Sequence, residues 1–168
     1  MVSSKTLKKF ISDYPSIPTI CLPKAIMNSC KTLSDCVFSG KSSHQSRIPI
    51  EVLDIALKKL TSAKLMSGTY ADFEELYDKV DDLLRPIKGI GDTAIYEFSV
   101  RIGNNLLTPK VLPDKYVYIH RGSKDGAKKL LGVSRLSFRV DKSKFPKDLQ
   151  KLTSVEIEDF LCTFKDKL

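Results

Sequence analysis

Residues 72–106 read DFEELYDKVDDLLRPIKGIGDTAIYEFSVRIGNNL, and this stretch decides the predicted fold. Asp72 followed three residues later by Glu75 is typical of a capping box, in which two side chains satisfy amides of the first helical turn. Apolar residues then recur at helical spacing and predict one buried stripe, made of Phe73, Leu76, Tyr77, Val80, Leu83 and Leu84. Pro86 ends this helix. A second helix is expected from Asp92 to about Leu106, with inward side chains at Ile95, Phe98 and Ile102.

Helical patterns continue on both sides of this stretch. We expect helices from Ser4 to about Tyr14, from Pro23 through Cys30 and Leu33, from Pro49 to before Gly68, briefly from Pro113, from Ser123 to Leu131, and from Thr153 to the C-terminal part. Residues 39–47 have no apolar member and are expected to form an exposed, mobile loop. Residues 136–140 alternate like a strand but lack an evident partner, so we interpret them as an extended linker.

These patterns predict an all-α fold, an orthogonal multi-helix array. Residues 1–168 are expected to form a single domain. Its predicted parts are a helical N-terminal part over 1–69, a central region over 70–131, and a linker with the C-terminal helix over 132–168.

Composition narrows the class of protein. The chain is 42% apolar and 29% charged, as in soluble globular proteins, which excludes collagenous and wholly disordered chains. No apolar run approaches the roughly 18 residues that a membrane helix requires, and no long apolar segment follows the N-terminal lysines. We therefore expect a cytoplasmic protein without a membrane partner.

Four cysteines leave two interpretations open. Cys21, Cys30 and Cys36 have the spacing of CCCH zinc fingers, but position 40 is Gly and the nearest histidine is His44. We favour buried structural cysteines over a zinc site and expect reduced thiols, Cys162 included. No metal site is therefore predicted.

Positive charge is concentrated in one part of the sequence. The net charge is +8, yet residues 1–84 carry 11 Lys and Arg against 10 Asp and Glu. Residues 85–151 carry 15 against 6, a net charge of +9, and residues 152–168 carry a net charge of −2. This segregation favours a nucleic-acid partner over a merely solubilising surface.

The turn between the two central helices contains the residues most suited to bind a ligand. It reads Arg85-Pro86-Ile87-Lys88-Gly89-Ile90-Gly91-Asp92-Thr93. Glycines at positions 89 and 91 would let the main chain approach a phosphate oxygen and adopt dihedral angles that side chains disfavour. Ile90 would fill the space between the helices, while amides at the start of the second helix would attract an anion. A plain helical turn is the alternative.

Together these features resemble the helix-hairpin-helix DNA-binding proteins and, distantly, the DNA glycosylases of that superfamily. The resemblance covers about residues 70–131 and implies contacts to phosphates, which fix position without reading base sequence. One departure is Ile95, where the family usually has a small residue. DNA contacts are predicted at the turn and at basic and polar side chains beyond it. These residues are Lys88, Gly89, Ile90, Gly91, Thr93, Lys115, Arg121, Ser123, Lys124 and Lys128.

The glycosylase resemblance also implies one catalytic candidate. Those enzymes place an aspartate at the start of a helix that follows the hairpin, and Asp114, after Pro113, has a comparable position. An N-cap is the alternative role for Asp114. Thr93 stands where members with lyase activity have a nucleophilic lysine, so Schiff-base chemistry is not expected.

Three functions follow from the sequence. The leading prediction is a protein that grips duplex DNA with little sequence specificity; enzymatic activity is left open, with binding alone favoured. One alternative is a monofunctional DNA glycosylase that uses Asp114, and the other is a helical module that binds an acidic partner protein. No cofactor is expected, although the hairpin leaves room for a monovalent cation.

Overall fold

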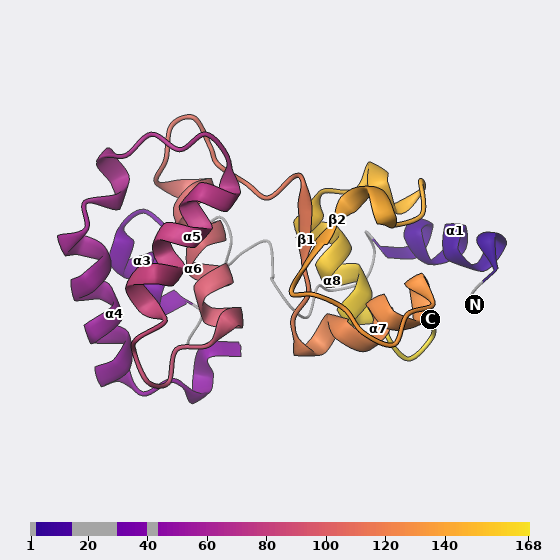
Figure 1. Cartoon of the computed structure of the whole chain (residues 1–168), viewed down its shortest axis with the longest axis horizontal. Helices are drawn as coiled ribbons and strands as arrows, with labels where there is room; N and C mark the ends of the chain where they lie inside the picture. The colour runs from indigo at the N-terminus through magenta and orange to yellow at the C-terminus, as the bar shows by residue number, and fades with distance from the viewer. Residues whose placement is uncertain (1–2, 15–29, 40–43) are drawn as a thin grey trace. The chain divides into compact units, whose positions relative to one another are not determined.

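The computed structural model describes residues 3–14, 30–39 and 44–168, and these fall into two compact units. Unit 1 comprises Met1–Pro23 and Pro113–Leu168, and unit 2 comprises Lys24–Leu112 (Figure 1). The described residues contain seven α-helices and one small two-stranded sheet, which confirms the all-α class. The division between residues 112 and 113 runs through the predicted central region 70–131.

All the secondary structure of the described part of unit 2 is helical. Its elements are α3 (Leu33–Phe38), the 3-10 helix η3 (His44–Arg47), α4 (Ile50–Ser62), the 3-10 helix η4 (Leu65–Ser67), α5 (Phe73–Leu84) and α6 (Asp92–Asn105). The predicted stripes are buried at most of their positions, including Leu53 and Leu60 on α4. The predicted capping box of α5 is half formed: the Asp72 carboxylate accepts a hydrogen bond from the Glu75 amide at 2.9 Å, but the Glu75 carboxylate accepts one from the Ala71 amide instead of from Asp72.

Helix α6 is buried on all sides. Every residue from 94 to 104 is buried, including Glu97 and Arg101, whereas the sequence predicted only an inward stripe. α5 packs along α6 as the other arm of a helical hairpin, with α3 and η3 also in contact with α6 (Figure 1). At Gly103 the helix lies so close to the following segment that an added Cβ would stand 2.0 Å from the Val111 carbonyl oxygen.

Two predictions for the N-terminal part of unit 2 are wrong. Thr32 is the N-cap of α3 and forms a capping box with Asp35, so a helix does not continue from Cys30 through Leu33. The rest of the helix predicted from Pro23 lies outside the described residues, as do positions 40–43 of the predicted loop. Gln45, predicted to be exposed, is 1% exposed because it hydrogen-bonds to Glu97 in the core.

Unit 1 joins the two ends of the chain. Its elements are α1 (Ser4–Asp13), β1 (Tyr116–Tyr118), α7 (Arg121–Leu131), β2 (Arg139–Asp141), the 3-10 helices η5 (Lys142–Lys144) and η6 (Leu149–Lys151), and α8 (Ser154–Phe164). α8 supplies Phe160, Leu161 and Phe164 to an apolar core that also includes Leu7 of α1. The Tyr14 hydroxyl donates a 2.8 Å hydrogen bond to the buried Asp159 carboxylate.

The short sheet corrects two further predictions. Residues from Pro113 onward do not start a helix; residues 116–118 form β1. β1 pairs antiparallel with β2, with Tyr116 opposite Asp141 and Tyr118 opposite Arg139. The segment interpreted as an unpaired linker therefore ends in a paired strand. Its partner was not predicted because it lies more than twenty residues upstream in the sequence.

Helices α7 and α8 pack closely. Gly126 of α7 faces the Leu161 carbonyl oxygen, which would lie 2.3 Å from an added Cβ. α7 ends at Gly132, whose φ of 66° is left-handed as predicted for a C-cap, and the predicted capping box of Thr153 and Glu156 opens α8. Cys162 of α8 is disulfide-bonded, contrary to the expected reduced state, whereas Cys30 and Cys36 are buried and not disulfide-bonded.

Candidate nucleic-acid interface

The α5–α6 hairpin exposes its turn and buries two isoleucines beneath it. After α5 ends, the Ile87 amide donates to the Leu84 carbonyl at 2.9 Å, and the Ile90 amide donates to the Ile87 carbonyl at 3.1 Å. Ile87 and Ile90 are each 7% exposed, while Lys88 and Gly89 between them are exposed. The isoleucines thus anchor the turn, and the main chain around Gly89 faces solvent.

The two glycines of the turn have different roles. Gly89 has a φ of 101°, a backbone conformation that side chains rarely adopt. Gly91 has a φ of −115° and a ψ of 177°, an extended conformation open to any residue. The expectation that both glycines are required by their dihedral angles therefore holds for Gly89 alone.

Gly91 is the N-cap of α6 and leaves its first turn open. Among the described residues, no side chain caps this helix and no atom lies within 4 Å of where a Cβ on Gly91 would stand. An α-helix leaves the amides of its first turn without intrahelical partners, and here these belong to Asp92, Thr93 and Ala94. The main chain at Gly91 can therefore approach an anion closely.

The side-chain charges around the hairpin are nearly balanced. Arg85 contacts the Asp81 carboxylate at 2.5 Å and also forms an ion pair with Asp92. The hydrogen bond to Asp92 raises the pKa of Arg85 above its ordinary value. Arg85 is thus paired with two carboxylates, and Lys88 is the other exposed cation of the turn.

The predicted contact residues divide between the two units. Lys88, Gly89, Ile90, Gly91 and Thr93 belong to unit 2, and Lys115, Arg121, Ser123, Lys124 and Lys128 belong to unit 1. Ile90 is buried and can only support the turn. In unit 1, Arg121 and Lys124 are exposed, Lys128 is half-buried, and the Lys115 ammonium lies 5.1 Å from the centre of the Tyr116 ring.

Ser123 does not offer its side chain to a ligand. It is fully buried, and its hydroxyl accepts a hydrogen bond from the His120 amide at 3.1 Å. The helix predicted to start at Ser123 begins two residues earlier, at Arg121, with His120 as N-cap. Ser123 therefore stabilises the first turn from within, and a phosphate contact through its hydroxyl is a wrong prediction.

Asp114 lies in an environment unlike that expected for a catalytic carboxylate. It precedes β1 rather than a helix, so it is not an N-cap, and its side chain is 94% exposed. Lys142 approaches its carboxylate at 3.5 Å, and its carbonyl accepts a hydrogen bond from Ser154 at 3.0 Å. Neither contact provides the burial or the second acid that base excision would use.

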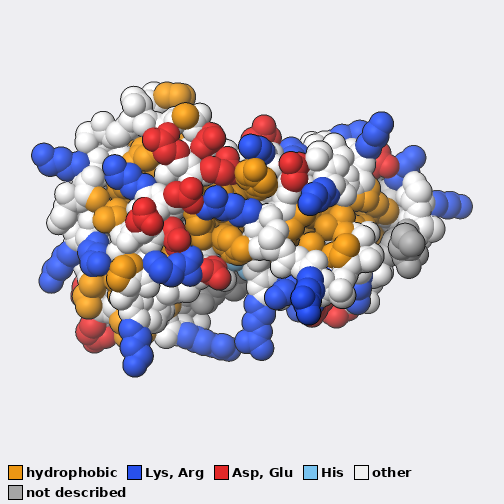
Figure 2. Space-filling model, viewed as in Figure 1, with side chains coloured by type: hydrophobic (Ala, Val, Ile, Leu, Met, Phe, Trp, Pro, Cys, Tyr) orange, Lys and Arg blue, Asp and Glu red, His pale blue; other side chains and the backbone are white. Residues whose placement is uncertain are grey.

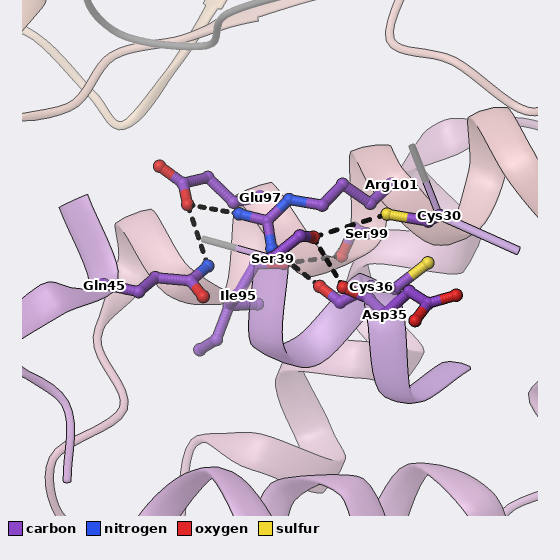
Figure 3. A network of polar contacts seen from close by, with 9 residues as sticks. All are labelled: Cys30, Asp35, Cys36, Ser39, Gln45, Ile95, Glu97, Ser99 and Arg101. Atoms are coloured by element: carbon purple, nitrogen blue, oxygen red, sulfur yellow. Dashed lines mark hydrogen bonds and ion pairs between the residues drawn. The ribbon is translucent and has the colours of Figure 1, made fainter. Parts of the chain in front are cut away.

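A buried polar network in unit 2 was missed by the sequence analysis (Figure 3). The Arg101 guanidinium, 0% exposed, donates to the Glu97 carboxylate and to the Cys36 carbonyl, each at 2.6 Å. The Gln45 amide donates to the same Glu97 oxygen at 2.8 Å. The four-residue spacing of Glu97 and Arg101 indicates an ion pair, but such pairs are usually solvated on a helix surface. The network joins α6 to α3 and η3.

Comparison with known proteins adds no relative. No protein-family model, curated protein or solved structure matches the chain. Across the described stretches of the chain, every helix is too short or too polar to cross a membrane.

Proposed function

We propose that this protein binds duplex DNA and that the α5–α6 hairpin acts as a helix-hairpin-helix. In this proposal the main-chain amides of the turn and of the first turn of α6 hold a backbone phosphate. Such contacts position the protein on the duplex without reading its sequence.

The open N-terminus of α6 at Gly91 is the observation that carries the proposal. Two other helices of unit 2, α3 and α5, have side-chain caps from Thr32 and Asp72, whereas α4 begins after Pro49 without one. α6 instead begins at an exposed glycine with free space around it. A turn that served only to reverse the chain would gain stability from a capping side chain at this position, whereas a phosphate site requires the amides to remain accessible.

The buried isoleucines support the same proposal. Ile87 and Ile90 hold the turn from below, and the left-handed φ of Gly89 brings the chain back toward α6 without a side chain. A turn whose main chain is already fixed loses little conformational entropy when it binds an anion.

The variant Gly91→Ser distinguishes a phosphate-binding site from a plain turn. The serine hydroxyl can accept a hydrogen bond from the first-turn amides, so the helix should become more stable by a few tenths of a kcal/mol. The same hydroxyl would compete with a phosphate for these amides. We expect affinity for a short labelled duplex to fall at least about tenfold, the equivalent of one hydrogen bond to a charged group.

The matched control is Pro49→Ser, at the N-terminus of α4, which also has no capping side chain. This variant adds the same hydroxyl to unit 2 and leaves the hairpin unchanged, so its DNA affinity should equal that of the wild type. Fluorescence anisotropy gives the affinities, and chemical denaturation gives the stabilities. Wild-type affinity in a stabilised Gly91→Ser protein would reject the hairpin as the contact.

A further inference from the structure

We infer that α7 of unit 1 forms a second phosphate-binding surface, chemically distinct from the hairpin, and that it supplies most of the electrostatic affinity for duplex DNA. The inference rests on the proposed function for the identity of the partner. The surface consists of Arg121, Lys124 and Lys128 and is called the α7 stripe below.

The positive charge of the chain resides in unit 1. Unit 2 carries 12 Lys and Arg against 11 Asp and Glu, whereas unit 1 carries 16 against 9, a net charge of +7. On the face shown in Figure 2, acidic side chains gather over the part of unit 2 that contains α5, and Lys and Arg predominate over unit 1. A hairpin with balanced side chains in a nearly neutral unit does not generate the field that attracts a polyanion.

The acidic side chains of unit 1 are largely engaged within the unit. Asp114 pairs with Lys142, Asp148 pairs with Lys151, and the Asp141 carboxylate accepts a hydrogen bond from the Ser143 amide. Glu158 and Asp159 are buried at 3% and 2% exposure. These carboxylates are therefore poorly placed to neutralise cations on the surface of α7.

The α7 stripe has the geometry of a cationic ridge. At 100° per residue its three side chains lie within about 60° of one another around the helix axis, and they span about 10 Å along it. None of the three forms an ion pair or hydrogen bond with another described residue. Asp125 lies at the edge of the stripe and is the only acidic residue of α7.

The opposite face of α7 fixes the stripe in place. Gly126 and Ala127 are buried there, and Gly126 allows the backbone of α7 to approach Leu161 of α8. The ammonium of Lys129 donates to the Lys165 carbonyl at 2.6 Å, which joins the last turn of α7 to the end of α8. α7, held against α8, therefore presents three cations along one face, where they can meet the row of phosphates of a duplex.

The two surfaces should leave different signatures in the salt dependence of binding. Side-chain cations that neutralise phosphates release counterions, with a contribution to the slope of log K against log salt of about 0.9 per phosphate for duplex DNA. Main-chain amides neutralise no charge and should change affinity without changing the slope.

The test compares two triple variants of the full chain with the wild type. Arg121→Gln, Lys124→Gln and Lys128→Gln together remove the α7 stripe, and we expect the slope to become shallower by about 2 to 3. The control removes three exposed cations from α4 and its C-terminal end, by Lys58→Gln, Lys59→Gln and Lys64→Gln, and should leave the slope nearly unchanged. Circular dichroism verifies that both proteins are folded.

Several results would overturn the inference. An unchanged slope in the α7 variant would show that the stripe does not face DNA, and equal changes in both triple variants would indicate diffuse attraction. Displacement of DNA by poly-glutamate at equal charge would assign the stripe to acidic proteins. Gly91→Ser keeps the outcomes separate. If this variant binds DNA like the wild type while the α7 variant has a shallower salt slope, the hairpin proposal fails and the α7 stripe stands. If Gly91→Ser weakens DNA binding while the α7 variant keeps the wild-type slope, only the α7 stripe is rejected.

Discussion

Removal of the buried guanidinium should destabilise the protein severely. Arg101→Met would retain most of the side-chain volume but leave the Glu97 carboxylate, 2% exposed, without its charged partner at 2.6 Å. It would also remove the donor to the Cys36 carbonyl. Breaking one side of a buried ion pair costs about 3–5 kcal/mol, and we expect the free energy of unfolding to fall by that amount.

A double variant determines whether the charge or the packing is responsible. Glu97→Gln combined with Arg101→Met removes both charges and keeps an oxygen that can accept from Gln45. Its cost should be only about 1–2 kcal/mol, mainly from the lost donor to Cys36, so the double variant should be more stable than Arg101→Met alone.

Urea denaturation followed by far-ultraviolet circular dichroism is the suitable assay, because the chain contains no tryptophan. The wild type, both single variants and the double variant complete a thermodynamic cycle. A loss below about 1 kcal/mol in Arg101→Met, or a double variant at least as unstable as that single variant, would refute the account of the network as a buried ion pair.

Two further predictions concern local packing and capping. Gly126→Ala would stabilise an ordinary helix interior by up to about 1 kcal/mol, but here the new Cβ would stand 2.3 Å from the Leu161 carbonyl oxygen. We therefore expect a loss of about 1–3 kcal/mol in thermal or urea unfolding, and stabilisation would show that α7 and α8 are not in close contact. Hydrogen bonds from the Lys31 and Thr32 amides lower the pKa of Asp35 below its ordinary value of 3.8. Asp35→Asn should destabilise the protein at neutral pH, and the difference from the wild type should close as the pH falls through that lowered pKa; a difference independent of pH would contradict this role.

Local patterns in the sequence predicted the helices whose signals are local. The boundaries of α5 and α8 follow from Asp72 and Thr153, because a cap and an apolar stripe lie within a few residues of one another. The turn at Gly89 was located for the same reason. Which of its two glycines needs a left-handed φ could not be predicted, because that depends on how the turn meets α6.

Features that depend on distant partners were missed. Tyr116 begins a strand only because Asp141 pairs with it, and Pro113 alone resembles a helix start. Glu97 and Arg101 would be surface residues on an isolated helix, and α3 and η3 bury them. The division of the basic stretch between two units was hidden too, since its residues are continuous in sequence.

The chain order of the two units has a consequence for synthesis on the ribosome. Every residue of unit 2 has been made once Leu112 has been added, whereas α1 must wait for α8. The Tyr14 hydroxyl meets its Asp159 acceptor only after 145 further residues have been made. Nascent unit 2 can therefore acquire its core while α1 still exposes the apolar side chains of Leu7 and Tyr14 to solvent.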